Sequence, residues 1–289
     1  MKPTRILDSH VHLTDTRHVG YLWEADTRIG RQTLPSDYFA ATAGFPVEAL
    51  VFIEAAARAD WAVEEAHWIK GLAEAGAPIA AIVAQADLRR GAAIEEQLDQ
   101  LAALEGVRGV RWILEPPFEN DPDACVRPAF IEAAKLLPRY DFSLDISVKN
   151  SALPDVVRLV RTCPDVRFIL DHMGKPAIAE GTTEPWRSHI RELAGLDNIV
   201  CKISGMPMEA GPGWTVDSIR PYAEAVAEAF GPDRILYGSD YPAQAPVSDF
   251  AAWTAAIVEI VGAGSAEEVD RFFYANAAET YRVAEPVKA

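Results

Sequence analysis

The stretch Arg5-Ile6-Leu7-Asp8-Ser9-His10-Val11-His12 has the pattern of a first β-strand and ends in two histidines. Because the side chains of a strand alternate between its faces, His10 and His12 should point the same way. Neutral imidazole is the commonest metal ligand in proteins, so such a pair is half of a metal site. A dinucleotide-binding fold would carry a glycine-rich turn here, and this stretch contains no glycine. The opening strand therefore favours a fold with a polar site at its strand ends.

Short apolar runs alternate with longer amphipathic runs along the chain, which indicates βα units and a parallel sheet. We expect strands at Ile6–Asp8, Leu50–Glu54, Ile79–Ala84, Val107–Trp112, Phe142–Ile146, Val166–Asp171, Ile199–Ser204 and Ile235–Ser239. We expect helices at Ala62–Ala75, Ala93–Leu104, Pro128–Leu137, Leu153–Thr162, Pro185–Leu196, Val216–Phe230 and Phe250–Val261, with a last one near Ala266–Tyr281. Eight alternations in 289 residues predict a (β/α)8 TIM barrel that occupies residues 1–289 as a single domain.

Two segments lack a clear pattern. The longer one, Leu13–Ala49, is expected to form an irregular flap over the strand ends. The other, Gly211–Gly213, is expected to be a loop beyond the seventh strand.

The composition limits the partners of the chain. It has 43 acidic and 27 basic residues and a net charge of −16, which argues against nucleic acid or an anionic membrane as a partner. The three cysteines are far apart, so neither a disulfide framework nor a thiolate zinc site is expected. No apolar stretch suits a signal peptide or a membrane span, which predicts a cytoplasmic protein. We expect a small-molecule substrate, and homo-oligomer formation is left open.

Two later strands also end in residues that can do chemistry. Asp171-His172 follows Arg167–Leu170, and Gly238-Ser239-Asp240 follows Arg234–Tyr237. Taken alone, a strand-end histidine is often a hydrogen-bonded core residue, and Gly-Ser-Asp is common turn chemistry. In a closed barrel, however, the eighth strand lies next to the first and the sixth is one strand removed. His10, His12, His172 and Asp240 should then converge, which predicts a hydrolase or a lyase.

Four motifs resemble the amidohydrolase superfamily, and more narrowly its sugar-lactonase branch of fuconolactonases and rhamnonolactonases. The motifs are Asp8-Ser9-His10-Val11-His12, Leu170-Asp171-His172-Met173-Gly174-Lys175-Pro176, Val200-Cys201-Lys202-Ile203-Ser204-Gly205 and Tyr237-Gly238-Ser239-Asp240-Tyr241-Pro242. The resemblance implies that Asp240 is a general base that activates water. It also implies that His10, His12 and His172, with Asp240, bind a divalent ion or hold a lactone carbonyl. Arg111 stands on the fourth strand, so no carboxylated lysine is expected there, and the site would be at most mononuclear.

The physical chemistry allows two mechanisms. A Zn²⁺ ion held by imidazoles lowers the pKa of bound water to about 7, and an aspartate with a pKa of about 3.9 is ionised and can take the proton. Lactones are easier to hydrolyse than amides, so an oriented water and polarising imidazoles could suffice without a metal. One zinc ion and a metal-independent site both stay open.

Several further residues are candidates for contacting the substrate. Arg111, Lys149 and Lys175 could clamp a carboxylate or hydroxyl groups. Lys202 lies within an apolar strand and is expected either to contact the substrate or to form a structural ion pair. A further group consists of Tyr241 as a wall of the pocket, Trp23 as part of the flap, and Asp8 as a residue that orients an imidazole.

The leading interpretation is a hydrolase that opens a five- or six-membered lactone of an aldonic or related carboxylated acid, with a role in carbohydrate catabolism. Met206–Gly211 is less polar than a sugar pocket needs, which leaves the sugar class open. One alternative is a metal-dependent non-oxidative decarboxylase of an aromatic or muconate-type acid. Another is a barrel that binds ligands without catalysis, and the cost of keeping unpaired buried polar groups argues against it.

Overall fold

The computed structural model describes residues 1–23, 32–262 and 264–283. Its main sheet has eight parallel strands, and each lies beside its neighbour in chain order. The strands are β1 (Ile6–Val11), β4 (Val47–Ile53), β5 (Ile79–Gln85), β6 (Val107–Ile113), β7 (Ser143–Ser147), β8 (Arg167–Leu170), β9 (Ile199–Ile203) and β10 (Ile235–Tyr237). A small antiparallel sheet pairs β2 (Thr14–Asp15) with β3 (Gln32–Thr33). The order of the main sheet confirms the predicted (β/α)8 barrel.

The barrel closes just beyond the ends of its first and last strands. Val11 pairs with Tyr241 in a parallel bridge, and the backbone N–H of His12 donates to the carbonyl oxygen of Tyr241 at 2.8 Å. The backbone N–H of Asp240 donates to the carbonyl oxygen of His10 at 2.9 Å. The closure therefore places His10 and His12, near the start of the chain, beside Asp240, near its end.

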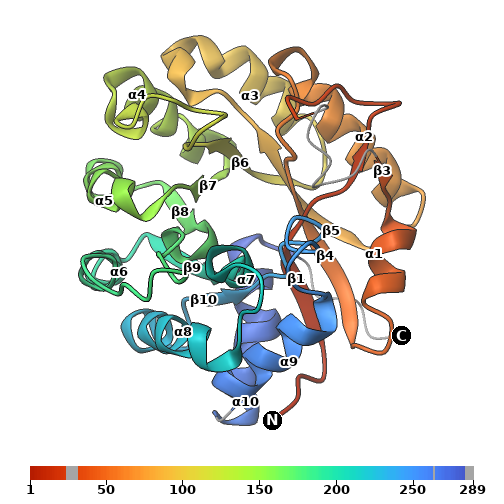
Figure 1. The fold of residues 1–289 in the computed structure, drawn as a ribbon. Coiled ribbons are helices and arrows are strands. Elements are labelled where there is room, and N and C mark those ends of the chain that lie inside the picture. Colours follow the sequence, from red (N-terminus) through yellow and green to blue (C-terminus); the bar gives the residue numbers. More distant parts are fainter. Residues whose placement is uncertain (24–31, 263, 284–289) are drawn as a thin grey trace.

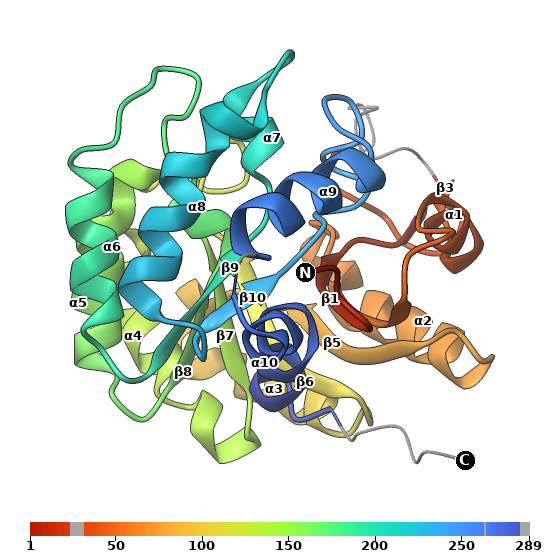
Figure 2. The same cartoon turned by 90° about the horizontal axis from the view of Figure 1, so that it is seen from below.

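The helices lie around the outside of the strands (Figure 1). They are α1 (Pro35–Ala41), α2 (Ala62–Glu74), α3 (Glu95–Ala102), α4 (Pro128–Ala134), α5 (Leu153–Thr162), α6 (Trp186–Ala194), α7 (Met206–Ala210), α8 (Val216–Phe230), α9 (Phe250–Val261), α10 (Ala266–Asp270) and α11 (Asn276–Thr280). Figure 2 shows α5, α6 and α8 side by side along one flank of the barrel. Within the described ranges, none of the helices has the length and apolar character to cross a membrane.

Amphipathic helices build the layer between sheet and solvent. In α5, Val156, Val157 and Val160 are buried against the core, whereas Arg158 and Arg161 are exposed. Burying one such apolar side chain contributes roughly 1.5–3 kcal/mol. This helix has the bounds that its periodicity predicts, since the pattern covers its whole length.

Two short helices were not expected. Helix α1 lies inside the segment predicted as an irregular flap, and α7 directly follows β9. They have 7 and 5 residues, too few for an apolar stripe to repeat. Residues 24–31 of the predicted flap lie outside the described residues.

The sixth and eighth strands end earlier than predicted. Strand β8 stops at Leu170 and β10 at Tyr237, because the residues that follow leave the extended conformation. His172 has a φ of 51° and Asp240 a φ of 56°, both in the left-handed region. Such a backbone costs of order 1–3 kcal/mol per residue and persists only when its surroundings hold it. Both turns carry a polar side chain at the carboxyl end of a strand.

Candidate active site

A cavity of about 280 Å³ opens at the carboxyl ends of the strands. Its polar lining includes His12, Arg111, His172 and Asp240. The remaining lining comes from the last residues of strands and the segments that follow them, and consists of Trp23, Ile113, Glu115, Pro116, Pro117, Phe118, Ser147, Lys149, Lys175, Gly205, Met208, Glu209 and Ala243. The cavity therefore lies where barrel enzymes place their chemistry.

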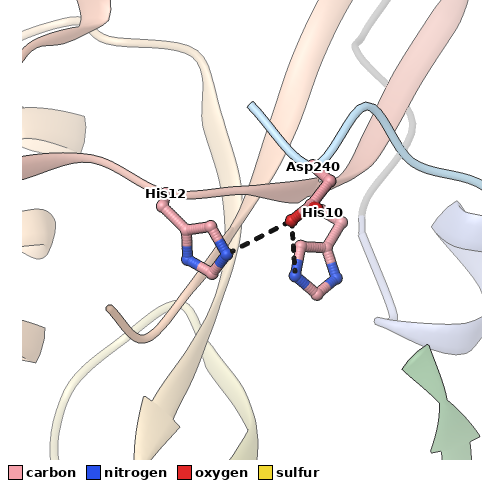
Figure 3. Close-up of side chains that lie close together, drawn as sticks. All are labelled: His10, His12 and Asp240. Atoms are coloured by element: carbon pink, nitrogen blue, oxygen red, sulfur yellow. Dashed lines mark ion pairs between the residues drawn. The ribbon is translucent and has the colours of Figure 1, made fainter. Parts of the chain in front are cut away.

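Three imidazoles face one carboxylate oxygen in this cavity. The Nε2 atoms of His12, His10 and His172 lie 3.6, 3.7 and 3.9 Å from Oδ1 of Asp240. Figure 3 shows His10, from β1, and His12, from the residue just beyond β1, on either side of Asp240, from the segment after β10. His10 itself is fully buried, and His12, His172 and Asp240 are each 6% exposed. The structure thus brings together the four residues that the sequence predicted.

His172 is held by its own turn and by the neighbouring strand end. Its Nδ1 lies 2.9 Å from the hydroxyl of Ser204. Gly205 follows with a φ of 65°, and a Cβ atom at that position would lie 2.7 Å from Nδ1 of His172. Glycine at position 205 therefore leaves the space that the imidazole occupies.

Burial and charge set the protonation of the site. Burial lowers the pKa of His172 to about 4, although Asp240 and Asp171 act in the opposite direction. Burial also holds the pKa of His10 well below its ordinary value. Burial alone would raise the pKa of Asp240, but His172, His12 and His10 together hold it well below the usual range. At neutral pH the site therefore combines an ionised carboxylate with neutral rings on His10 and His172.

The donor atoms fit a single divalent ion. Nδ1 of His12 lies 2.9 Å from the carbonyl oxygen of Ile53, which can only accept, so Nδ1 carries the proton in the neutral ring. In that tautomer Nε2 of His12 carries a lone pair, which a cation between the ring and the Asp240 carboxylate could accept. His10, His12 and Asp240 offer ligand atoms that lie within 4.8 Å of one another. Imidazole nitrogens with a carboxylate oxygen are a donor set that zinc accepts.

A second group of possible ligands, His10, Asp171 and His172, suits a metal less well. Both oxygens of Asp171 already face cations of the protein. Nη1 of Arg111 donates to Oδ2 at 3.1 Å, and Nζ of Lys202 lies 2.9 Å from Oδ1. The protein's own cations thus neutralise this carboxylate, in keeping with the mononuclear site that the resemblance implies.

Arg111 lines the cavity but is fully engaged by the protein. It is 3% exposed, and its Nε donates to Glu54 at 2.7 Å while Nη1 donates to Asp171. Nη1 also lies 3.4 Å from Nε2 of His10. The role predicted for Arg111, a clamp for a substrate carboxylate, would require it to leave these partners.

Lys202 lies outside the cavity lining. Its side chain is fully buried, and Nζ lies 2.6 Å from Asp145 and 2.9 Å from Asp171. Nζ also lies 3.3 Å from Nδ1 of His10, on the opposite side of the ring from Arg111. Of the two expectations for Lys202, the structure shows the buried ion pair, because two carboxylates, one from β7 and one from the residue just after β8, lie within its reach.

Lys149 and Lys175 line the cavity, and both face Glu115. Nζ of Lys175 donates to Oε1 of Glu115. Nζ of Lys149 lies 3.7 Å from Oε2 of Glu115 and 3.4 Å from Oε1 of Glu209. The two lysines that the sequence suggested as clamps are therefore part of an ion-pair belt, which we define as Glu115, Lys149, Lys175 and Glu209.

Trp23 and Tyr241 are two further positions predicted to contact the substrate, and the structure places them differently. Trp23 lines the cavity, and its Nε1 donates to the carbonyl oxygen of Ala55. Tyr241 does not line it: the ring packs against Tyr38, with centroids 5.5 Å apart, and faces a separate hollow. The structure therefore places Tyr241 outside the lining of this cavity.

Asp8 does not orient an imidazole. A register shift between Asp8 and Val11 interrupts the alternation of β1, so the carboxylate does not share the face of the histidines. It accepts from the hydroxyl of Tyr38 and from the backbone N–H of Ser239, each at 2.8 Å. Burial raises its pKa to about 6. Asp8 instead fixes the turn that carries Asp240.

Glu115, Ser204 and Glu209 are site residues that the sequence reasoning did not single out. Glu115 lies two residues beyond β6 and is 6% exposed. The sequence signal for Glu115 is its position just after a predicted strand, which is the same signal that identified Asp240. Ser204 stood inside a quoted motif, but its partner His172 is distant in sequence.

Comparison with known proteins gives a consistent picture. Residues 7–283 match the family model described as amidohydrolase. An L-fucono-1,5-lactonase of Burkholderia multivorans is 31% identical over 300 residues, which cover 98% of this chain and 98% of that protein. A 4-sulfomuconolactone hydrolase of Rhizobium radiobacter is 29% identical over 137 residues, 47% of this chain and 44% of that protein.

A solved structure shares the architecture over nearly its full length. It is an amidohydrolase from Burkholderia multivorans with bound zinc, and it is 28% identical to this chain with a TM-score of 0.84. The match covers 96% of this chain and 99% of that one.

Proposed function

Because this chain belongs to the amidohydrolase family, we propose that it is a hydrolase that opens a lactone ring. The substrate would be a five- or six-membered lactone of an aldonic or related carboxylated acid. One observation supports this most strongly: the Nε2 atoms of three imidazoles lie within 3.6–3.9 Å of one carboxylate oxygen beside the cavity. The lactonases among the relatives, which share the family, add to this support.

Asp240 is the proposed general base. Its carboxylate is ionised, because the surrounding imidazoles hold its pKa well below the usual range against the effect of burial. It takes a proton from water as the water oxygen bonds to the lactone carbonyl carbon. When the bond from that carbon to the ring oxygen breaks, the same proton passes to the ring oxygen. Lactone and water thus give one hydroxy acid, and Asp240 is restored.

The imidazoles hold the reacting groups. His10, His12 and Asp240 are the residues that would bind one divalent ion, which we propose is Zn²⁺, with His172 facing the same oxygen. When bound, this ion supplies a Lewis acid that polarises the carbonyl and lowers the pKa of bound water to about 7. The neutral ring of His172, held by Ser204, lines the cavity, and in this proposal it contacts the lactone carbonyl.

The test uses a panel of hydroxylated aldonolactones and carboxylated lactones, with acid release followed by a pH indicator. We expect the wild type to open at least one of them. The variant Asp240→Asn keeps the side chain's shape and tolerates the positive φ of this position, so it should fold. It should bind the substrate and lose roughly 100- to 10,000-fold in kcat. Full activity in Asp240→Asn, or no ring opening with any lactone, would overturn the proposal.

A further inference from the structure

The ion-pair belt lines the cavity and is centred on Glu115. This carboxylate is 6% exposed, and the hydroxyl of Ser147 donates to its Oε1 at 3.0 Å. Lys175 donates to the same oxygen, and Nζ of Lys149 lies 3.7 Å from the other. Glu115 therefore has cationic or hydroxyl partners on both of its oxygens.

Within the described residues, each cation that lines the cavity has a carboxylate partner. Lys175 faces Glu115, and Lys149 lies between Glu115 and Glu209. Arg111 pairs with Glu54 and Asp171. An anionic group on a substrate would have to share one of these cations with a carboxylate or replace that carboxylate, and it would lie close to the carboxylates that remain. Taking an anion out of water without a free cation is costly.

The same belt suits hydroxyl groups well. Paired lysine and glutamate side chains keep N–H donors and carboxylate lone pairs that a neutral hydroxyl can use without breaking the pair. The lining also contains apolar side chains, among them Trp23, Phe118 and Met208. A ring with hydroxyls on one edge and C–H bonds on its face can contact both kinds of side chain.

We propose that Glu115 is a specificity-determining residue, which pairs with Lys149 and Lys175 so that the cavity takes neutral, hydroxylated lactones and rejects lactones that carry a further anionic group. This inference rests on the proposed lactone hydrolysis and selects between its two substrate classes. Burial alone would raise the pKa of Glu115, but Lys175 and Lys149 lower it, which keeps the carboxylate ionised and the lysines paired.

The experiment compares kcat/KM for a neutral aldono-1,5-lactone with kcat/KM for muconolactone, which carries a free carboxylate. The wild type should favour the neutral lactone at least tenfold. Glu115→Gln keeps the shape of the side chain. It removes the negative charge that pairs with Lys175 and one of the two carboxylate partners of Lys149. This variant should lower the preference at least tenfold, mainly through a lower KM for muconolactone.

Glu74→Gln is the matched control, since Glu74 is an exposed residue of α2 that pairs with Lys70 outside the cavity. It should leave the preference unchanged. If the wild type opens muconolactone at least as well as the neutral lactone, the inference is overturned but the lactonase proposal is not. A folded Glu115→Gln enzyme with the wild-type preference has the same consequence. A wild type that opens neither lactone, nor any other in the panel, overturns both. The wild-type ratio by itself supports or overturns the inference even if Glu115→Gln does not fold.

Discussion

The backbone N–H of Asp240 donates to the carbonyl oxygen of His10 at 2.9 Å, so one of the hydrogen bonds that close the barrel also joins the proposed base to an imidazole. A second bond, from the N–H of His12 to the carbonyl oxygen of Tyr241, lies beside it. The separation of 3.7 Å between the side chains of His10 and Asp240 therefore depends on the closure of the sheet. Catalytic geometry and barrel closure share the same backbone contacts.

Removing one ligand should weaken metal binding. Protein stripped with a chelator and titrated with Zn²⁺ should bind one ion per chain, and His12→Ala should bind it at least tenfold more weakly, because Nε2 of His12 faces Asp240. Isothermal titration calorimetry measures this without reference to activity. His189→Ala, in α6, is the control and should bind as the wild type does. Two ions per chain, or an unchanged affinity in His12→Ala, would contradict the assignment.

The pH profile should reflect the buried imidazole of His172. Burial lowers its pKa to about 4, so the ring stays neutral as the pH falls through the ordinary histidine range and gains its proton only near pH 4. Activity needs the neutral ring, so kcat/KM should be level between about pH 5 and pH 7 and should decline toward pH 4. Initial rates corrected for spontaneous hydrolysis test this, with recovery at pH 7 as the control for unfolding. A midpoint near the ordinary histidine pKa of about 6.5 would show that the site is more hydrated than the structure indicates.

Lys202 should be important for stability. Replacing it with Met leaves the carboxylates of Asp145 and Asp171 buried without the positive charge of Lys202, whose Nζ lies within 2.9 Å of both. Breaking a buried pair in this way costs about 3–5 kcal/mol. Urea unfolding should show this loss for Lys202→Met. Lys70→Met, which removes a partly exposed pair with Glu74, should cost at most about 1 kcal/mol. Similar losses in the two variants would argue against the buried network.

Gly205→Ala should reduce turnover through His172. The new methyl group would lie 2.7 Å from Nδ1 of the imidazole, so the ring must move. A shift of about 1 Å at a reacting group costs roughly 100-fold in rate. Gly181→Ala is a close control, because Gly181 has a φ of 66° and no atom within 4 Å of the added Cβ. Both variants carry the same backbone strain, so equal kcat values would exclude a role for the clash.

Sequence patterns predicted the barrel and the four converging residues, because both follow from local periodicity. His10 and His12 share a face, and His172 and Asp240 follow strands that the barrel brings next to β1 or near it. The patterns failed where the structure depends on distant partners. Lys202 reaches carboxylates from two other strands, 57 and 31 residues away in sequence, and nothing local indicates them.

Irregular backbone accounts for the other differences. The bulge in β1 turns Asp8 away from the imidazoles, and alternation cannot reveal such an extra residue. Asp240 has a positive φ, and Tyr241 lines a different hollow, although the sequence places it beside the base. Short helices such as α7 lack the length that a period needs.

The ion-pair belt has an evolutionary consequence. Glu115, Lys149, Lys175 and Glu209 lie on four different segments, after β6, β7, β8 and β9, whereas His10, His12 and Asp240 are held by the closure of the barrel. The segment after β8 also carries His172, three residues before Lys175. The other three segments can be lengthened or exchanged in a descendant gene and each bring one new charge, while the inherited hydrolytic centre stays untouched. Diversification among relatives should therefore be fastest at these three segments and slowest at the seam of the barrel.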